Sequence, residues 1–125
     1  MASVTQSPAP RKVRKFEPVS GVFTWKTPWD GSTGELVIST RTGAAVYTVS
    51  ALRSGTSPHF GGLVAGYELV NQGNGEVYAV SLQSWGLDCE CWDGLLRQQY
   101  AEQPECRACK HVTALQAALP GQQAA

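Results

Sequence analysis

The stretch DCECWDGLLRQQYAEQPECRACKHVTAL, residues 88–115, contains all four cysteines of the chain and one of its two histidines. Cys89 and Cys91 are separated by a single residue. Residues 92–108 then separate this pair from Cys109 and His111, which have the same spacing. Structural zinc prefers four thiolate or imidazole ligands in a tetrahedron. Two close pairs on different elements can supply opposite edges of that tetrahedron, so the stretch predicts a metal site.

Cys106 is a fifth candidate ligand. It makes CRAC, residues 106–109, a C-x-x-C motif, which is a common spacing in zinc sites. An all-cysteine site would use Cys106 with the three other cysteines and would leave His111 outside. The spacing alone leaves both ligand sets open.

The same residues also allow chemistry without a structural metal. Disulfides would fit the even number of cysteines, but no apolar export signal precedes them. A Cys–His nucleophile needs one reactive thiolate beside an imidazole, whereas clustered thiols favour a metal. A catalytic zinc needs an open coordination position and an acid or base, for which Glu90 and Asp93 are the candidates. An enzyme that uses the cluster as a thiol or catalytic zinc site is therefore the alternative hypothesis.

Helical periodicity surrounds the cysteines. Trp92, Leu96 and Tyr100 recur at helical spacing and predict a short amphipathic helix whose apolar stripe faces the core. A second helix is predicted in CKHVTALQAAL, residues 109–119, which ends before a Pro-Gly pair. Its buried face would contain Val112, Leu115 and Leu119.

The chain before the cysteines alternates like β-strands. Runs at 21–26, 35–40, 45–52, 62–70 and 76–82 are separated by turn residues, and Asn74-Gly75 is a favoured hairpin turn. In the third run, Tyr47 and Val49 fall on one face. The expected fold class is α+β, with an antiparallel β-rich part of four or five strands, then a zinc finger with two short helices.

The order C-x-C, spacer, C-x-H resembles the SWIM-type zinc finger. The hairpin YELVNQGNGEVYAVSL and the helix CKHVTAL also resemble that family, so the similarity covers residues 66–119. Small bacterial SWIM-like proteins look similar overall. The resemblance implies one structural zinc held by Cys89, Cys91, Cys109 and His111, with Cys106 as a spare thiol. It also implies a non-enzymatic module that contacts a protein or nucleic acid.

These patterns divide the chain into four parts. Residues 1–18 are expected to form a disordered basic tail, and 19–82 the antiparallel β region. Residues 83–120 would form the SWIM-like finger, with its hairpin lead-in from about residue 66. Residues 121–125 would be a second disordered tail.

The charges are balanced, with ten basic and ten acidic residues, so no overall field favours nucleic acid. The basic residues nevertheless gather in the tail, and they could contact phosphates together with one lysine beside the cysteines. Acidic residues around the cysteines favour a protein partner instead, and the sequence leaves the partner undecided. No small-molecule substrate is indicated. No apolar run reaches membrane-spanning length, so we expect a cytoplasmic protein without membrane contact. The candidate nucleic-acid contacts are Arg11, Lys12, Arg14, Lys15 and Lys110.

Overall fold

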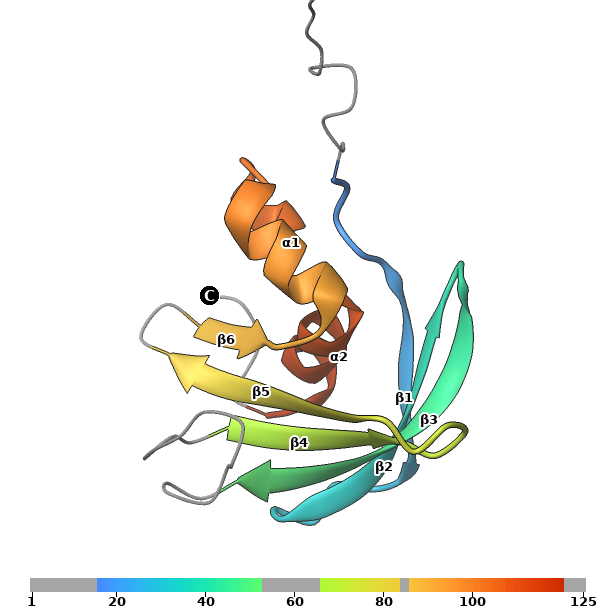
Figure 1. Ribbon diagram of the computed structural model, residues 1–125. Helices are drawn as coiled ribbons and strands as arrows, with labels where there is room; N and C mark the ends of the chain where they lie inside the picture. Colours follow the sequence, from blue (N-terminus) through green and yellow to red (C-terminus); the bar gives the residue numbers. More distant parts are fainter. Residues whose placement is uncertain (1–15, 53–65, 84–85, 121–125) are drawn as a thin grey trace, which may run out of the picture.

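The computed structural model describes residues 16–52, 66–83 and 86–120. Within these residues, six strands form one antiparallel sheet in chain order, and two short helices follow them (Figure 1). The elements are β1 (Gly21–Thr27), β2 (Thr33–Thr40), β3 (Gly43–Leu52), β4 (Gly66–Asn71), β5 (Val77–Gln83), β6 (Gly86–Cys89), α1 (Trp92–Tyr100), the 3₁₀ turn η2 (Pro104–Cys106) and α2 (Lys110–Ala118).

The prediction of four or five strands followed by a separate zinc finger is wrong. The five predicted runs correspond to β1–β5, except that residues 62–65 of the fourth run lie outside the described residues. Strand β6 then extends the same sheet, with Val80 opposite Cys89 and Leu82 opposite Leu87. Leu87 and Cys89 do alternate with Gly86 and Asp88, but four residues are the shortest run in which alternation indicates a strand. The cysteine segment is therefore built onto the sheet rather than following it.

One face of the sheet is apolar because successive strand residues point to opposite sides. Leu36 and Ile38 on β2 lie on this face, and Tyr47 and Val49 on β3 lie beside them. These four side chains are at most 2% exposed. The predicted shared face of Tyr47 and Val49 is therefore confirmed.

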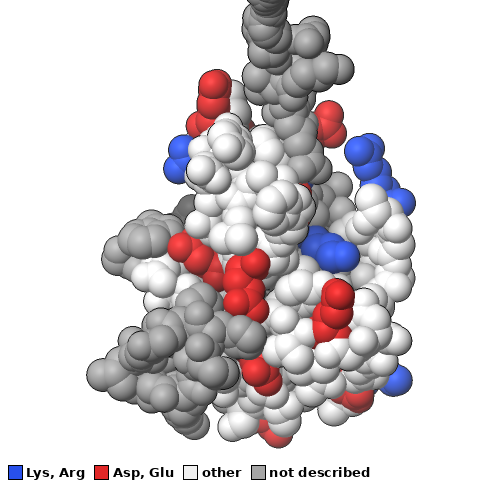
Figure 2. Space-filling model, viewed as in Figure 1, with Lys and Arg blue, Asp and Glu red and all other residues white. Residues whose placement is uncertain are grey.

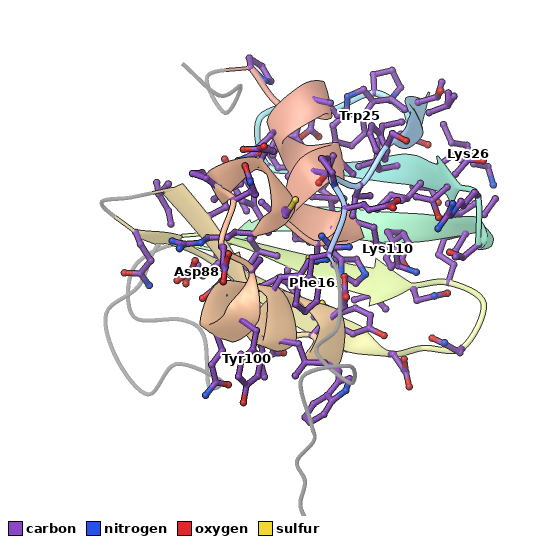
Figure 3. All side chains as sticks on the ribbon, turned by 90° about the horizontal axis from the view of Figure 1, so that it is seen from above. Phe16, Trp25, Lys26, Asp88, Tyr100 and Lys110 are labelled. Atoms are coloured by element: carbon purple, nitrogen blue, oxygen red, sulfur yellow. The ribbon has the colours of Figure 1, made fainter. Side chains whose placement is uncertain are left out.

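Helix α2 covers this apolar face. It packs against β1, β2 and β6, and so it contacts both edge strands of the sheet (Figure 1). At the far end of the helix, Trp25 Nε1 on β1 donates a hydrogen bond of 3.2 Å to the Ala118 carbonyl. The Trp25 side chain lies beside α2 (Figure 3). The predicted buried face is confirmed in Val112, Leu115 and Leu119. Helix α2 thus connects the first and last strands.

Helix α1 has the opposite orientation from the one predicted. The exposed fractions are 75% for Trp92, 49% for Leu95 and 61% for Tyr100, and Leu96 is half-buried. Tyr100 projects from the helix away from the sheet (Figure 3). The assignment of this apolar stripe to the core is therefore wrong.

Gly94 and Arg97 occupy the inner side of α1 instead. A Cβ atom at Gly94 would lie 2.9 Å from the Cys89 carbonyl oxygen and 3.2 Å from Cys91 Sγ, so only glycine permits this approach. Arg97 Nη1 donates to the carbonyls of Glu17 and Cys106, each at 2.7 Å. A glycine contact and a buried guanidinium therefore fix the helix, in place of apolar packing.

Within the described residues, no helix has the length and apolar character needed to span a membrane.

Candidate metal centre

The four predicted ligands come from three neighbouring elements. Cys89 is the last residue of β6, and Cys91 is the N-cap of α1. Cys109 is the N-cap of α2, and His111 lies in the first turn of that helix. The packing of α2 across the sheet brings the second pair next to the first. Sheet pairing and helix packing together position these four side chains.

The four side chains converge on one point. Their candidate ligand atoms all lie within 4.8 Å of one another. His111 Nδ1 is 3.6 Å from Cys89 Sγ and 3.8 Å from Cys109 Sγ. Zinc–ligand distances of about 2.3 Å for sulfur and 2.0–2.1 Å for nitrogen give tetrahedral edges of about 3.5–3.6 Å between nitrogen and sulfur and about 3.8 Å between two sulfurs. The two nitrogen–sulfur distances are close to such an edge, and the cluster is compact enough to hold one metal ion.

The imidazole of His111 is held by two tyrosines. The Nε2 atom lies 3.3 Å from the Tyr47 hydroxyl, which leaves Nδ1 facing the sulfurs. The ring stacks on Tyr78 at a centroid distance of 4.4 Å, and it meets Tyr47 edge-on at 5.3 Å. Metal-bound histidines usually have such a partner on their second ring nitrogen. The sequence did not indicate that these two tyrosines contact His111. The alternation of a strand predicts which side chains face the core, and it does not predict which residue of a distant helix they meet.

Backbone amides support the sulfurs. Gly94 N donates to Cys91 Sγ at 3.2 Å, and Cys91 N donates to Cys89 Sγ at 3.5 Å. Both Cys91 and Cys109 precede helix N-termini, whose dipoles favour thiolates.

The thiols also interact strongly with one another. Hydrogen bonds from Cys109 and Cys89 hold the pKa of the Cys91 thiol well below its usual value. Hydrogen bonding to Cys109 and Cys91 raises the pKa of Cys89. Like charges in close contact oppose full ionisation of all three groups. A divalent cation at the centre would remove that opposition, and the donor set therefore fits a metal such as zinc.

Cys106 lies apart from this group. It is buried on η2 and does not belong to the cluster of four. The four cysteines are free thiols, without disulfides. The geometry therefore assembles three cysteines with His111 and does not assemble the all-cysteine alternative.

The predicted nucleic-acid contacts are only partly visible. Arg11, Lys12, Arg14 and Lys15 lie outside the described residues. Lys110 is the first residue of α2 and is half-buried. It borders a pocket of about 560 Å³ that adjoins the cluster and is also lined by Arg41 and Trp92.

Basic side chains lie where the β2–β3 tip approaches the helices, and acidic ones are spread over the strands below α1 (Figure 2).

In the described residues, the fold and the site define a class. It is a six-stranded antiparallel sheet with a helix packed on one face, and a buried Cys₃His cluster that could hold a metal ion. No family model matches the chain, and neither the curated proteins nor the solved structures gave a match.

Proposed function

We propose that the cluster binds one zinc ion, through the sulfurs of Cys89, Cys91 and Cys109 and through Nδ1 of His111. The supporting observation is the convergence of four buried or nearly buried donors within 4.8 Å. Three thiolates with one imidazole form a soft ligand set that suits zinc better than magnesium or calcium. The C-x-C and C-x-H pairs correspond to the SWIM-type ligand pattern, here placed at the end of β6 and at the N-termini of α1 and α2.

The proposed zinc is structural, and the protein is not an enzyme. Four protein ligands would fill the tetrahedron and leave no position for a substrate. The two carboxylates nominated as acid or base have other contacts. Glu90 Oε2 accepts a hydrogen bond from the Ala79 amide at 3.1 Å, and Asp93 pairs with Arg97 at 2.8 Å. These contacts favour a supporting role for both residues over catalysis.

We further propose that the module contacts a protein partner in the cytoplasm. A nucleic-acid surface needs several free cations along a continuous path. Arg97 lines the pocket beside the cluster, but it is largely buried because it pairs with Asp93 and donates to the Cys106 carbonyl. The other basic residues that line this pocket are Lys110 and Arg41. Two acidic residues flank Cys89 instead: Asp88 lies on β6, and Glu90 follows the end of that strand. A reducing compartment would keep zinc-binding thiols intact.

This proposal is tested on the purified full chain. Plasma mass spectrometry should find about one zinc per chain, which chelation removes. Fluorescence anisotropy should then show no steeply salt-dependent binding of the zinc-loaded protein to single- or double-stranded DNA. Binding that falls about a thousandfold between 50 and 200 mM salt would instead identify a nucleic-acid module.

Replacing Tyr47 with phenylalanine should weaken zinc binding about 10- to 100-fold, because His111 Nε2 would lose its hydroxyl partner. Competition with a coloured zinc chelator measures this change. Tyr78→Phe is the matched control, since its ring stacks on His111 whereas its hydroxyl donates to Glu76. Equal effects of the two variants would mean that the Tyr47 hydroxyl does not orient His111.

A further inference from the structure

The pocket of about 560 Å³ reaches the metal cluster from one side. Residues 17–20 form one wall, where the chain before β1 runs between α1 and the β2–β3 tip (Figure 1), and residues 40–42 form another. Cys91, Cys109 and His111 also line the pocket, whereas Cys89 is not among the residues that line it. A small solute in the pocket therefore lies next to two of the three cysteine ligands.

The cysteines of the chain differ in their exposure to such a solute. Cys91 is 9% exposed, whereas Cys89 and Cys109 are 2% and 1% exposed. Cys106 is buried and does not line the pocket. The oxidation of cysteine depends on thiolate character and on access. A bound zinc ion would keep all three ligands as thiolates, so access decides between them, and it favours Cys91.

Cys109 is placed to react with an oxidised Cys91. The ligand atoms of the cluster lie within 4.8 Å of one another, so the two sulfurs are close neighbours. Cys91 is the N-cap of α1 and Cys109 is the N-cap of α2, so a disulfide between them would join the helices where the metal joins them. A disulfide between Cys89 and Cys91 would instead close a ring of only three residues, which strains the bond.

We propose that Cys91 is a site of oxidation by hydrogen peroxide, and that Cys109 converts the oxidised Cys91 into a disulfide with loss of the metal. This inference rests on the proposed zinc site. It adds to that site a reversible chemical response, in which the protein gives up its metal when the peroxide concentration rises and binds metal again after reduction of the disulfide.

The chemistry takes two steps. In the first, the Cys91 thiolate attacks one oxygen of the peroxide: a sulfur–oxygen bond forms, the oxygen–oxygen bond breaks and hydroxide leaves. In the second, the Cys109 thiolate attacks the sulfur of the Cys91 sulfenic acid: the disulfide forms, the sulfur–oxygen bond breaks and a second hydroxide leaves. Two thiolates are oxidised and one peroxide is reduced. With two of its four ligands gone, the site no longer holds the ion.

Zinc release and thiol mapping of the zinc-loaded full chain test this inference. Hydrogen peroxide should release about one zinc per chain, which a coloured indicator measures. Peptide mapping by mass spectrometry should then find a disulfide between Cys91 and Cys109. Dimedone added with the peroxide should trap the sulfenic acid on Cys91, and dithiothreitol with zinc should restore the loaded protein. Cys106→Ala is the control, and it should react like the wild type because Cys106 is outside the cluster.

A second pair of variants tests the route through the pocket. Thr42 is an exposed residue of the pocket wall, and Thr42→Trp should slow zinc release at least about threefold by narrowing access to Cys91. Val22→Trp is the matched control, since Val22 is 67% exposed on β1 and does not line the pocket. It should release zinc at the wild-type rate. Zinc content and melting temperature before oxidation verify that both variants are folded.

The outcomes separate this inference from the zinc site itself. A purified protein without zinc would overturn both. A zinc-loaded protein that keeps its metal in peroxide, forms its disulfide through Cys106, or is trapped by dimedone at Cys89 would overturn only the oxidation site. Equal rates of zinc release from Thr42→Trp and Val22→Trp would overturn the route through the pocket.

Discussion

Replacing Cys91 with alanine is expected to release the metal and unfold the whole domain. Structural zinc contributes about 10–16 kcal/mol of apparent binding free energy in small zinc-binding peptides. A domain has only about 5–15 kcal/mol of total stability. The cluster belongs to the same core as the sheet and α2, so its loss should affect both. Circular dichroism melts and zinc content of the purified variant measure the result.

Cys106→Ala is the control for this experiment, because Cys106 is buried but lies outside the cluster. It should keep its zinc and lose about 1 kcal/mol of stability. A Cys91→Ala protein that retains zinc and melts like the wild type would contradict the ligand assignment. Zinc loss from Cys106→Ala would restore the all-cysteine alternative.

Replacing Leu115 with alanine is expected to cost about 2–5 kcal/mol in the free energy of unfolding. Leu115 is fully buried on α2, where the helix covers the apolar face of the sheet. Its truncation leaves a cavity beneath the helix that connects the first and last strands. Urea unfolding of the zinc-loaded protein measures the change.

Val22→Ala is the matched control, since this side chain is 67% exposed on β1. Its cost should stay below about 1 kcal/mol. If Leu115→Ala lowered the free energy of unfolding as little as the control does, α2 would not be packed on the apolar face of the sheet.

Much of this architecture follows from local patterns. Alternation predicts the face of Tyr47 and Val49, and helical spacing predicts the buried face of α2. The paired spacing of the cysteines and His111 singles out the residues that the structure groups together. These features depend on a repeat within a single element, which a sequence displays directly.

Other features depend on contacts between distant elements. Strand β6 has only four residues and exists because β5 pairs with it. The stripe of α1 has the periodicity of a buried helix face, but the close contact at Gly94 and the bonds of Arg97 turn it outward. Tyr47 and His111 are far apart in the sequence and meet only when α2 covers the sheet. Periodicity identifies an apolar face, and it does not identify what covers that face.

X-ray absorption at the zinc edge of the purified protein tests the central claim most directly. The Cys₃His site predicts one zinc per chain with three sulfurs at about 2.3 Å and one nitrogen at about 2.0–2.1 Å. A zinc shell of four sulfurs would mean that Cys106, and not His111, is the fourth ligand. A protein without bound metal, or a zinc shell of oxygen atoms, would contradict the account.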